Sequence, residues 1–385
     1  MLSGALRPIV LLAIVTGLGA ACASGGPTST AETRAGPAAP APASAAPPAP
    51  AASEAPATAP ASGEARALPP APDRPVEKVI VGVLGTTSDV LFYLAEENGY
   101  FEHMKIEPQF ERFDSGGREV ASLATNQIEV GGGSPSVGLY RAIARGVDVK
   151  MVADRASGSP GYIVFVRKDL ADQIKDYADL RGRRIAIAAK GTTAEVVVGR
   201  ALEKAGLTMD DIDLLEMAYP DMVAAMASGA IDVGVSPEPS PSIAVQQGVA
   251  VKWHTGYDIV GNQQGSVIVY TGQFIEQRPE IARDFMVAYL LGARDYTDAF
   301  VKGIPTKLAQ ARNTILTRTD LHDPALLDNM ETSRIDPNGR IDRAALAADY
   351  EWFREHEGLT ETVDLDAVVD TSFADYAVSV LGTYR

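Results

Sequence analysis

The chain has very little cysteine and histidine. Of its 385 residues, one is cysteine, Cys22, and four are histidine, His103, His254, His322 and His356. A lone cysteine cannot form a disulfide within the chain. The histidines are scattered, without the short spacing that zinc ligands usually show. The sequence therefore predicts neither a disulfide framework nor a metal site.

Motifs that mark common enzyme classes are also missing. The sequence has no Gly-x-Ser-x-Gly elbow and no Gly-Lys-Ser/Thr phosphate loop. Residues 131–136 come close to a dinucleotide-binding loop, but Ser136 stands where that loop has its last glycine, and the run follows the third expected strand instead of the first. We therefore expect no catalytic residue, no cofactor and no enzyme activity.

Long apolar runs are absent, and negative charge predominates. The formal net charge is −16. Residues 1–75 hold four basic and four acidic residues, so the whole excess lies in residues 76–385. An acidic body disfavours nucleic acid and anionic lipid surfaces as partners. No segment reaches the ~20 apolar residues that span a bilayer.

The first residues are typical of a targeting segment. Arg7 precedes an apolar run over residues 9–15, small residues follow, and Cys22 comes next. This order resembles a bacterial lipoprotein signal, although Gly19 stands where that signal usually has an aliphatic residue. We predict a signal peptide over residues 1–21 and lipidation of Cys22. The alternative is an ordinary secretory signal with an incidental cysteine.

A tether follows the predicted anchor. Residues 27–75 are almost entirely alanine, proline, serine, threonine and glycine. Such a composition cannot bury enough apolar surface to offset the entropy of ordering, and its prolines favour extended conformations. We therefore predict that residues 22–75 are a lipid-anchored, disordered linker. It would hold a soluble body outside the cytoplasm, in the periplasm or on the outer face of the cell membrane.

Three short blocks of the body occur twice, in the same order. The paired blocks are residues 85–90 and 191–196, 124–131 and 227–234, and 146–150 and 248–252. The first pair reads GTTSDV and GTTAEV. Repetition of this kind predicts two similar lobes, and a cleft between lobes is where ligands usually bind.

Strands and helices are expected to alternate within each repeat. Continuous β-branched segments such as residues 78–84 and 184–188 predict buried strands. Asp89 is placed to cap a helix over residues 90–98. Short links between alternating strands and helices predict mostly parallel sheets flanked by helices, hence a doubly wound α/β unit in each lobe.

We therefore predict an α/β protein with two doubly wound lobes around a cleft. Residues 161–167 and 265–270 are expected to form strands that cross between the lobes. Lobe 1 would contain residues 76–160 and 266–385, and lobe 2 residues 161–265. From residue 278 the chain predicts helices, which we expect to pack on lobe 1.

Small hydroxyl residues follow the expected strands at their carboxyl ends. Ligands of open α/β sheets bind there, where helix N-termini present free N–H groups and a favourable dipole for a polar or anionic group. The alternative is that each hydroxyl merely caps its own helix. The predicted ligand-binding residues are Thr86, Thr87, Ser88, Ser134, Ser136, Thr192, Thr193 and Glu238.

Other side chains near the same loops carry weaker signals. Arg155 and Lys190 could supply a cation to an anionic ligand, although such residues are usually solvated surface charges. Phe92, Tyr140 and Tyr162 could form a wall for an organic ligand, although aromatic residues in these elements usually belong to the core.

Five segments of the body occur in a specific order: residues 94–101, 124–131, 144–147, 179–186 and 201–206. In this order they resemble the solute-binding lipoproteins of ABC importers, in the nitrate/sulfonate/taurine group related to thiamine-pyrimidine-binding proteins. The resemblance covers roughly residues 78–300. It implies a periplasmic binding protein type II-like fold that captures a small polar or anionic organic solute and delivers it to a membrane permease.

The resemblance leaves the solute open and keeps two other function classes in view. One is an enzyme of the same fold, either a lyase or a relative of thiamine-pyrimidine synthase, which needs a cysteine-rich motif and a cofactor lysine. The other is a module that presents a solute to a sensor. The expected partners are the solute, the transmembrane subunits of an ABC permease and the membrane through the lipid anchor. We expect a monomer that binds no nucleic acid.

Overall fold

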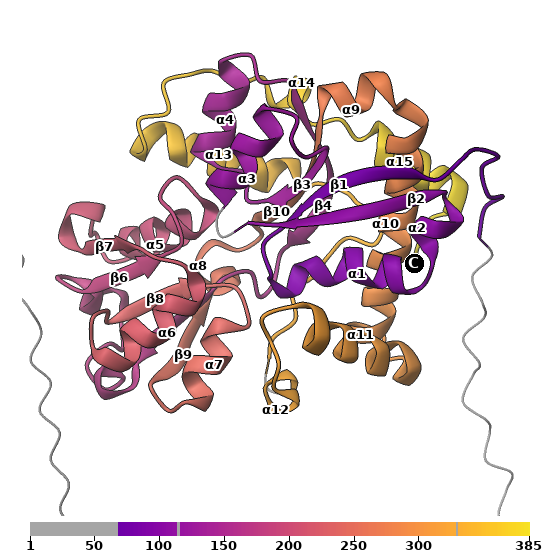
Figure 1. Cartoon of the computed structure of the whole chain (residues 1–385). Helices are drawn as coiled ribbons and strands as arrows, with labels where there is room; N and C mark the ends of the chain where they lie inside the picture. The colour runs from indigo at the N-terminus through magenta and orange to yellow at the C-terminus, as the bar shows by residue number, and fades with distance from the viewer. Residues whose placement is uncertain (1–67, 114–115, 329) are drawn as a thin grey trace, which may run out of the picture. The chain divides into compact units, whose positions relative to one another are not determined.

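The computed structural model describes residues 68–113, 116–328 and 330–385 (Figure 1). Two five-stranded sheets with surrounding helices make up this part of the chain. The predicted signal peptide, the lipidation site Cys22 and most of the linker fall outside the described residues.

Sheet A has the strand order β2-β1-β3-β10-β4. Strand β1 runs parallel to β2 and β3, whereas β10 runs antiparallel to β3 and β4. The strands are β1 Glu77–Val83, β2 Ile106–Arg112, β3 Val130–Gly133, β4 Val149–Ser157 and β10 Gln264–Thr271.

Sheet B has the order β7-β6-β8-β5-β9. Here β6 runs parallel to β7 and β8, and β5 runs antiparallel to β8 and β9. The strands are β5 Ile163–Arg167, β6 Arg184–Ile187, β7 Asp213–Glu216, β8 Val233–Ser236 and β9 Ala250–Thr255.

The expectation of mostly parallel sheets holds for four of the five strands in each sheet, whereas one inner strand, β10 in sheet A and β5 in sheet B, runs antiparallel. Both exceptions, β5 and β10, follow a passage of the chain from the other sheet. Neighbouring strands are parallel when a crossover connection brings the chain back to the end of the sheet at which the previous strand began. A strand that enters from the other sheet has no such crossover before it, so it can run in either direction.

The two sheets are built alike. Their strand orders correspond position by position, with β1, β3 and β10 matched by β6, β8 and β5. Paired repeat positions share the left-handed backbone: φ is +76° at Gly85 and +67° at Gly191, and +54° at Asn126 and +74° at Gly229. The sequence repeat therefore reflects a structural repeat. The lobe boundaries at residues 161 and 266 stay a prediction.

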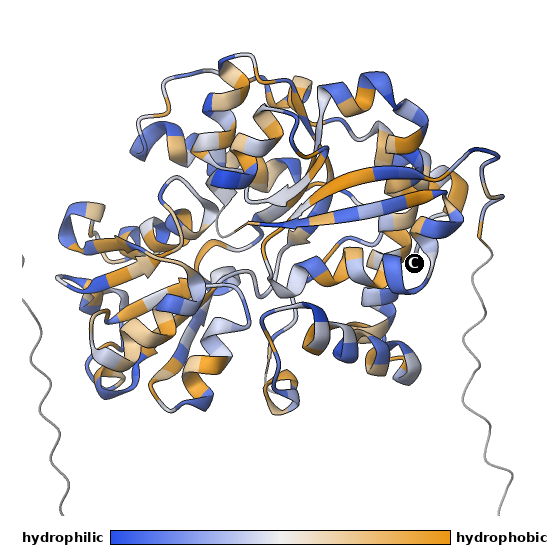
Figure 2. Cartoon of the chain, viewed as in Figure 1, coloured by the Kyte–Doolittle hydropathy of each residue, from blue (hydrophilic) through white to orange (hydrophobic). Residues whose placement is uncertain are grey.

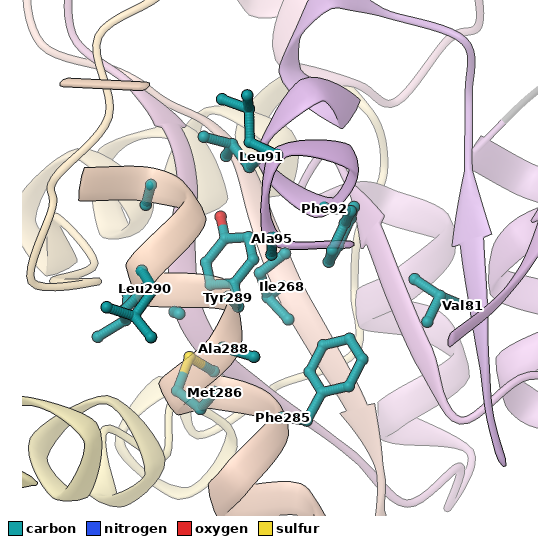
Figure 3. Close-up of a cluster of buried hydrophobic side chains, with 14 of the residues drawn as sticks. Val81, Leu91, Phe92, Ala95, Ile268, Phe285, Met286, Ala288, Tyr289 and Leu290 are labelled. Carbon is teal, nitrogen blue, oxygen red and sulfur yellow. The ribbon is translucent and has the colours of Figure 1, made fainter. Parts of the chain in front are cut away.

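The largest core lies between sheet A and helices that include α1, α10 and α11 (Figure 3). Phe92 of α1 packs on Tyr289 of α10, with ring centroids 5.3 Å apart. Gly292 allows the two helices to approach closely, since a Cβ there would lie 2.2 Å from the carbonyl oxygen of Leu91. The helices are α1 Val90–Glu97, α10 Pro279–Phe300 and α11 Pro305–Arg318.

Hydropathy follows the position of each strand within its sheet. Figure 2 shows β1 apolar along most of its length and β2 largely hydrophilic. The three residues at the carboxyl end of β1 are buried, whereas β2 is the edge strand of sheet A and is mostly exposed. Charged residues on an edge strand discourage pairing with other chains.

Helix α13, Arg343–His356, contacts both parts of the chain. Its Tyr350 ring packs edge-on against Tyr140 of α4, with centroids 4.9 Å apart. On the other side, the indole N–H of Trp352 donates to Glu203 of α5 over 3.0 Å. Helix α13 therefore packs on α4 of the first repeat, as expected of the C-terminal helices, and also reaches α5 of the second.

The remaining helices cover the sheets. Around sheet A and at the C-terminus they are α2 Tyr100–His103, α3 Gly116–Ala124, α4 Val137–Ala144, α9 Gly272–Gln277, α12 Pro324–Leu327, α14 Leu365–Val368 and α15 Ser372–Leu381. Around sheet B they are α5 Thr193–Glu203, α6 Tyr219–Ser228, α7 Ser240–Gln246 and α8 Gly256–Val260, with short 3-10 helices η2 Lys168–Leu170, η3 Tyr177–Leu180 and η4 Met209–Asp211. Within the described ranges, no helix combines the length and apolar character needed to cross a membrane.

Candidate functional site

In each of the two repeated loops, a buried acidic side chain accepts hydrogen bonds from main-chain N–H groups that precede it. After β1, Asp89 at the end of η1, Thr87–Asp89, accepts hydrogen bonds from the main-chain N–H groups of Leu84 (3.1 Å) and Thr86 (2.9 Å) through Oδ2. After β6, Glu195 accepts from the N–H of Gly191. The acid at this place in each repeat therefore fixes its own loop.

The loops of the two sheets touch each other. The N–H of Val137, at the start of α4, donates to the carbonyl of Gly191 over 2.8 Å. The hydroxyls of Ser134 and Thr193 lie 2.8 Å apart, and the Thr193 hydroxyl donates to the phenol oxygen of Tyr162 over 3.2 Å. The loop after β3 is thus held against the loop after β6.

A cavity of about 210 Å³ lies at this contact. Its size is below the ~300–1,000 Å³ of sites for drug-sized ligands, which favours a small solute. Hydroxyl groups from loops of both sheets line it, together with aliphatic side chains. The aliphatic lining residues are Leu84, Val120, Leu123, Leu139 and Val269.

A second, wider cavity of about 820 Å³ adjoins the first. We call it the outer cavity. The two cavities share four lining residues, Leu84, Thr86, Tyr219 and Pro237. Together they form one hollow between the loops of sheet A and those of sheet B.

The structure brings most of the predicted site residues to the smaller cavity. Six of them line it: Thr86, Thr87, Ser88, Ser134, Ser136 and Thr192. Thr193 does not line it but bonds to Ser134 and Tyr162, which do. Glu238 lines the outer cavity instead. Their contact with a ligand stays a prediction.

Some of these hydroxyls also have a local structural role. The Ser136 hydroxyl accepts from the N–H of Leu139 over 3.2 Å and so caps α4. The Thr192 hydroxyl donates to the carbonyl of Ala189 over 2.8 Å. A hydroxyl oxygen has one donor and two acceptor positions, so each retains capacity for a ligand.

Glu238 is held within its own part of the chain. Its carboxylate accepts from the ammonium of Lys252 (2.7 Å) and from the hydroxyl (2.8 Å) and N–H (3.2 Å) of Ser242. It is buried, so most of its accepting positions are used internally. This geometry favours a structural role at the start of α7.

Arg155, which projects from β4, is fully buried beside the cavity. Its guanidinium forms an ion pair with Asp89 and donates to the Ser266 hydroxyl over 3.0 Å. Its Nε is buried and has no hydrogen-bond partner among the described residues. Burial opposes the charged form, but Asp89 and Glu119 outweigh it and raise the pKa of Arg155. The guanidinium therefore remains charged.

Glu119, on α3, is the site residue that the sequence did not reveal. Its side chain is 2% exposed, and it lines the cavity. Oε1 accepts from the N–H of Gly132 over 2.7 Å. Burial raises the pKa of this carboxyl to about 7, although Gly132 and Arg155 oppose the rise. No motif surrounds Glu119, so only the fold identifies it.

Two further lining residues come from regions that no motif marked. Tyr219 begins α6 and faces both cavities. The amide of Gln263 donates to the carbonyl of Thr193 over 3.1 Å. Behind them, burial raises the pKa of Asp349 to about 7 despite a hydrogen bond with Gln263. Among the described residues, no cluster of His, Cys, Asp and Glu could hold a metal ion.

The profile of the family described as NMT1/THI5 like matches residues 87–299. At the level of sequence, the chain is 27% identical over 139 residues to a candidate binding protein of Brucella abortus strain 2308. That alignment spans 36% of this chain and 41% of the relative. The chain thus matches less than half the length of that relative.

Solved structures share the fold along most of their length. The alkanesulfonate-binding protein SsuA from Xanthomonas axonopodis pv. citri, bound to MOPS, superposes with a TM-score of 0.63 at 19% identity, covering 77% of this chain and 99% of that one. The periplasmic nitrate-binding protein NrtA from Synechocystis PCC 6803 gives 0.64 at 15% identity, covering 81% and 90%. At these identities the likeness shows the fold alone.

One solved structure with this fold is an enzyme. The desulfurization enzyme DSZB superposes with a TM-score of 0.56 at 18% identity, covering 79% of this chain and 99% of that one. The fold therefore serves both binding proteins and a catalyst, and the side chains of the site must distinguish them.

Proposed function

Because the chain belongs to the NMT1/THI5-like family, we propose that it is the solute-binding component of an ABC importer. It captures a small polar or anionic organic solute between two lobes and delivers it to a membrane permease. One observation carries the proposal: the small cavity is lined by hydroxyl groups from equivalent loops of two repeated sheets. The names of the alkanesulfonate- and nitrate-binding proteins support the nitrate, sulfonate and taurine class.

Capture would use the contacts between the loops. A solute that touches both lobes binds the closed arrangement better than the open one and so shifts the population toward it. The bond between Val137 and Gly191 and the Ser134–Thr193 pair join the same loops directly. These contacts would break on opening and form again around the solute.

The protein would work outside the cytoplasm. The proposed lipid on Cys22 would anchor it, and the linker up to residue 75 would let the body reach the permease. The periplasmic relatives among the solved structures support this location. The body would act as a monomer.

Thermal unfolding of the whole chain with candidate solutes tests the proposed function. The panel contains nitrate, alkanesulfonates, taurine, thiamine precursors, aromatic carboxylates and amino acids. A bound solute at about 100 times its Kd should add roughly 2.7 kcal/mol to the free energy of unfolding, which shifts the midpoint by degrees. A shift with one class supports the proposal. A flat response to all of them contradicts it.

We expect the double variant Thr86→Ala/Thr192→Ala to bind the identified solute about 5- to 150-fold more weakly. Each hydroxyl lost removes a hydrogen bond of roughly 0.5–1.5 kcal/mol, and the two lie on equivalent loops at the cavity. Titration calorimetry measures the change. The control is Thr317→Ala/Thr360→Ala, which alters two exposed threonines and should leave the affinity unchanged. Wild-type affinity in the double variant would remove these residues from the site.

A further inference from the structure

The small cavity has only three ionisable Glu, Asp, Lys or Arg side chains among its described lining residues, and they do not act alike. They are Glu119, Arg155 and Lys190. Lys190 is exposed at the rim, where water screens its charge. Glu119 and Arg155 are both buried, so their charges dominate the interior.

The positive charge of Arg155 is already balanced. It forms an ion pair with Asp89, whose side chain is 0% exposed. Asp89 is itself fixed by the N–H groups of Leu84 and Thr86. The Nε of Arg155 is buried against β3, where a Cβ on Gly132 would lie 2.7 Å from it. The guanidinium thus has a structural role in pairing with Asp89, and the pair presents little net positive charge to a solute.

Among the described residues, Glu119 has no ion-pair partner comparable to Asp89. Its carboxyl lies on the glycines of β1 and β3: a Cβ on Gly82 would be 2.7 Å from Oε1, and one on Gly133 would be 2.9 Å from Oε2. Oε1 accepts from Gly132. Within the described part of the chain, Oε2 has no hydrogen-bond partner. The cavity therefore presents one buried carboxyl oxygen that can accept from a solute.

We infer that the solute carries a protonated nitrogen, of the ammonium or amidinium class, which donates to Glu119. The inference rests on the proposed function and narrows its solute class. The nitrogen sits against Glu119, and the hydroxyls of the repeated loops hold any polar or anionic group of the same solute. The aliphatic lining residues contact its carbon body.

The balance of buried charge favours this class over a simple anion. An anion such as nitrate would enter beside an ionised Glu119 and a cation that Asp89 already neutralises, so it would bind only with Glu119 protonated. A buried charge is stable when it is paired and hydrogen-bonded, and a charge-assisted hydrogen bond is about twice as strong as a neutral one. Facing Glu119 are Arg155 from β4 and Asp89 from η1. The ammonium supplies the missing partner.

Matched small molecules test the inference on the whole chain at about pH 8, where Glu119 is ionised. The probes are taurine, isethionate and ethanesulfonate, which share the sulfonate and differ in the terminal group, together with ethylammonium. We expect taurine to bind roughly tenfold or more tightly than isethionate or ethanesulfonate, as one charge-assisted hydrogen bond predicts.

The variant Glu119→Gln separates recognition from folding. It keeps an acceptor for Gly132 and removes the charge, so the ratio of taurine to ethanesulfonate affinity should fall about tenfold or more. A residue that only supports the fold would lower both affinities together and leave the ratio unchanged. The control, Glu355→Gln, removes an equal charge from an exposed position on α13 and should keep the wild-type ratio.

The outcomes separate the inference about a protonated nitrogen from the proposed solute-binding function. Preference for taurine that disappears in Glu119→Gln supports the inference. Equal or tighter binding of isethionate or ethanesulfonate, in wild type, overturns the inference and leaves the proposed function standing. Absence of binding by all four probes overturns the inference, and the wider thermal-unfolding panel then decides the proposed function.

Discussion

Replacing Asp89 with asparagine should lower the free energy of unfolding by about 3–5 kcal/mol, because it leaves Arg155 charged and unpaired inside the protein. Asparagine can still accept from Leu84 and Thr86, so the loop keeps its bonds. The variant therefore loses only the contribution of the ion pair to the free energy of unfolding. Replacing one partner of a buried pair is costly because the remaining charge cannot return to water.

Urea unfolding of the whole chain measures this loss. The double variant Asp89→Asn/Arg155→Met removes both charges and should recover part of the stability. The control, Asp320→Asn, breaks the exposed pair with Arg112 and should cost no more than about 1 kcal/mol. If Asp89→Asn and Asp320→Asn lowered the free energy of unfolding equally, the buried pair would stabilise the fold no more than an exposed one, which would contradict this prediction.

The free energy of unfolding should also fall as the pH rises from about 4.5 to about 7. Burial raises the pKa of four carboxyl groups to about 7: Glu119, Asp154, Glu195 and Asp349. In this window the folded chain holds protons that the unfolded chain has released. Stability is therefore greatest below the unfolded pKa values and is lost as these groups ionise.

The combined loss should reach several kcal/mol, since each pKa unit corresponds to roughly 1.4 kcal/mol. Further acidification reverses the trend, because hydrogen bonds and ion pairing with Arg184 outweigh burial and lower the pKa of Asp232. Urea unfolding at a series of pH values gives the slope, and Glu119→Gln should reduce it. Stability that rises steadily from about pH 4.5 to 7 would show that the four carboxyls ionise normally.

Much of the architecture follows from local sequence. The repeated Gly-Thr-Thr blocks predicted equivalent loops, and Gly85 and Gly191 both adopt the left-handed backbone there. The fold class and the family resemblance are confirmed by the two sheets and by the family profile over residues 87–299. Short-range patterns determine these features, so a single sequence carries them.

Long-range pairing was harder to predict. The antiparallel course of β5 and β10 depends on where the chain enters each sheet, which strand hydrophobicity does not encode. Asp89 was expected to cap a helix, yet its carboxylate accepts from the loop before it and pairs with Arg155, 66 residues away. Helix α13 contacts α5 through Trp352, and the sequence of α13 does not indicate which helix it packs against.

The site shows the same division. Hydroxyl residues adjacent to the repeats were predictable, and six of them line the cavity. Glu119 was not, because an acid in the first turn of a helix usually favours the helix dipole and faces water. Only the glycines of β1 and β3, which leave room for its carboxyl, show that this acid is buried.

As a binding protein, the chain should bind a small solute in this cavity and release it unchanged. Titration calorimetry of the whole chain with taurine, followed by chromatography of the recovered solute, tests this expectation. We expect one site per chain, full recovery of taurine, and weaker binding in Thr86→Ala/Thr192→Ala. Conversion of the taurine during the titration, or binding that this double variant leaves intact, would contradict the expectation.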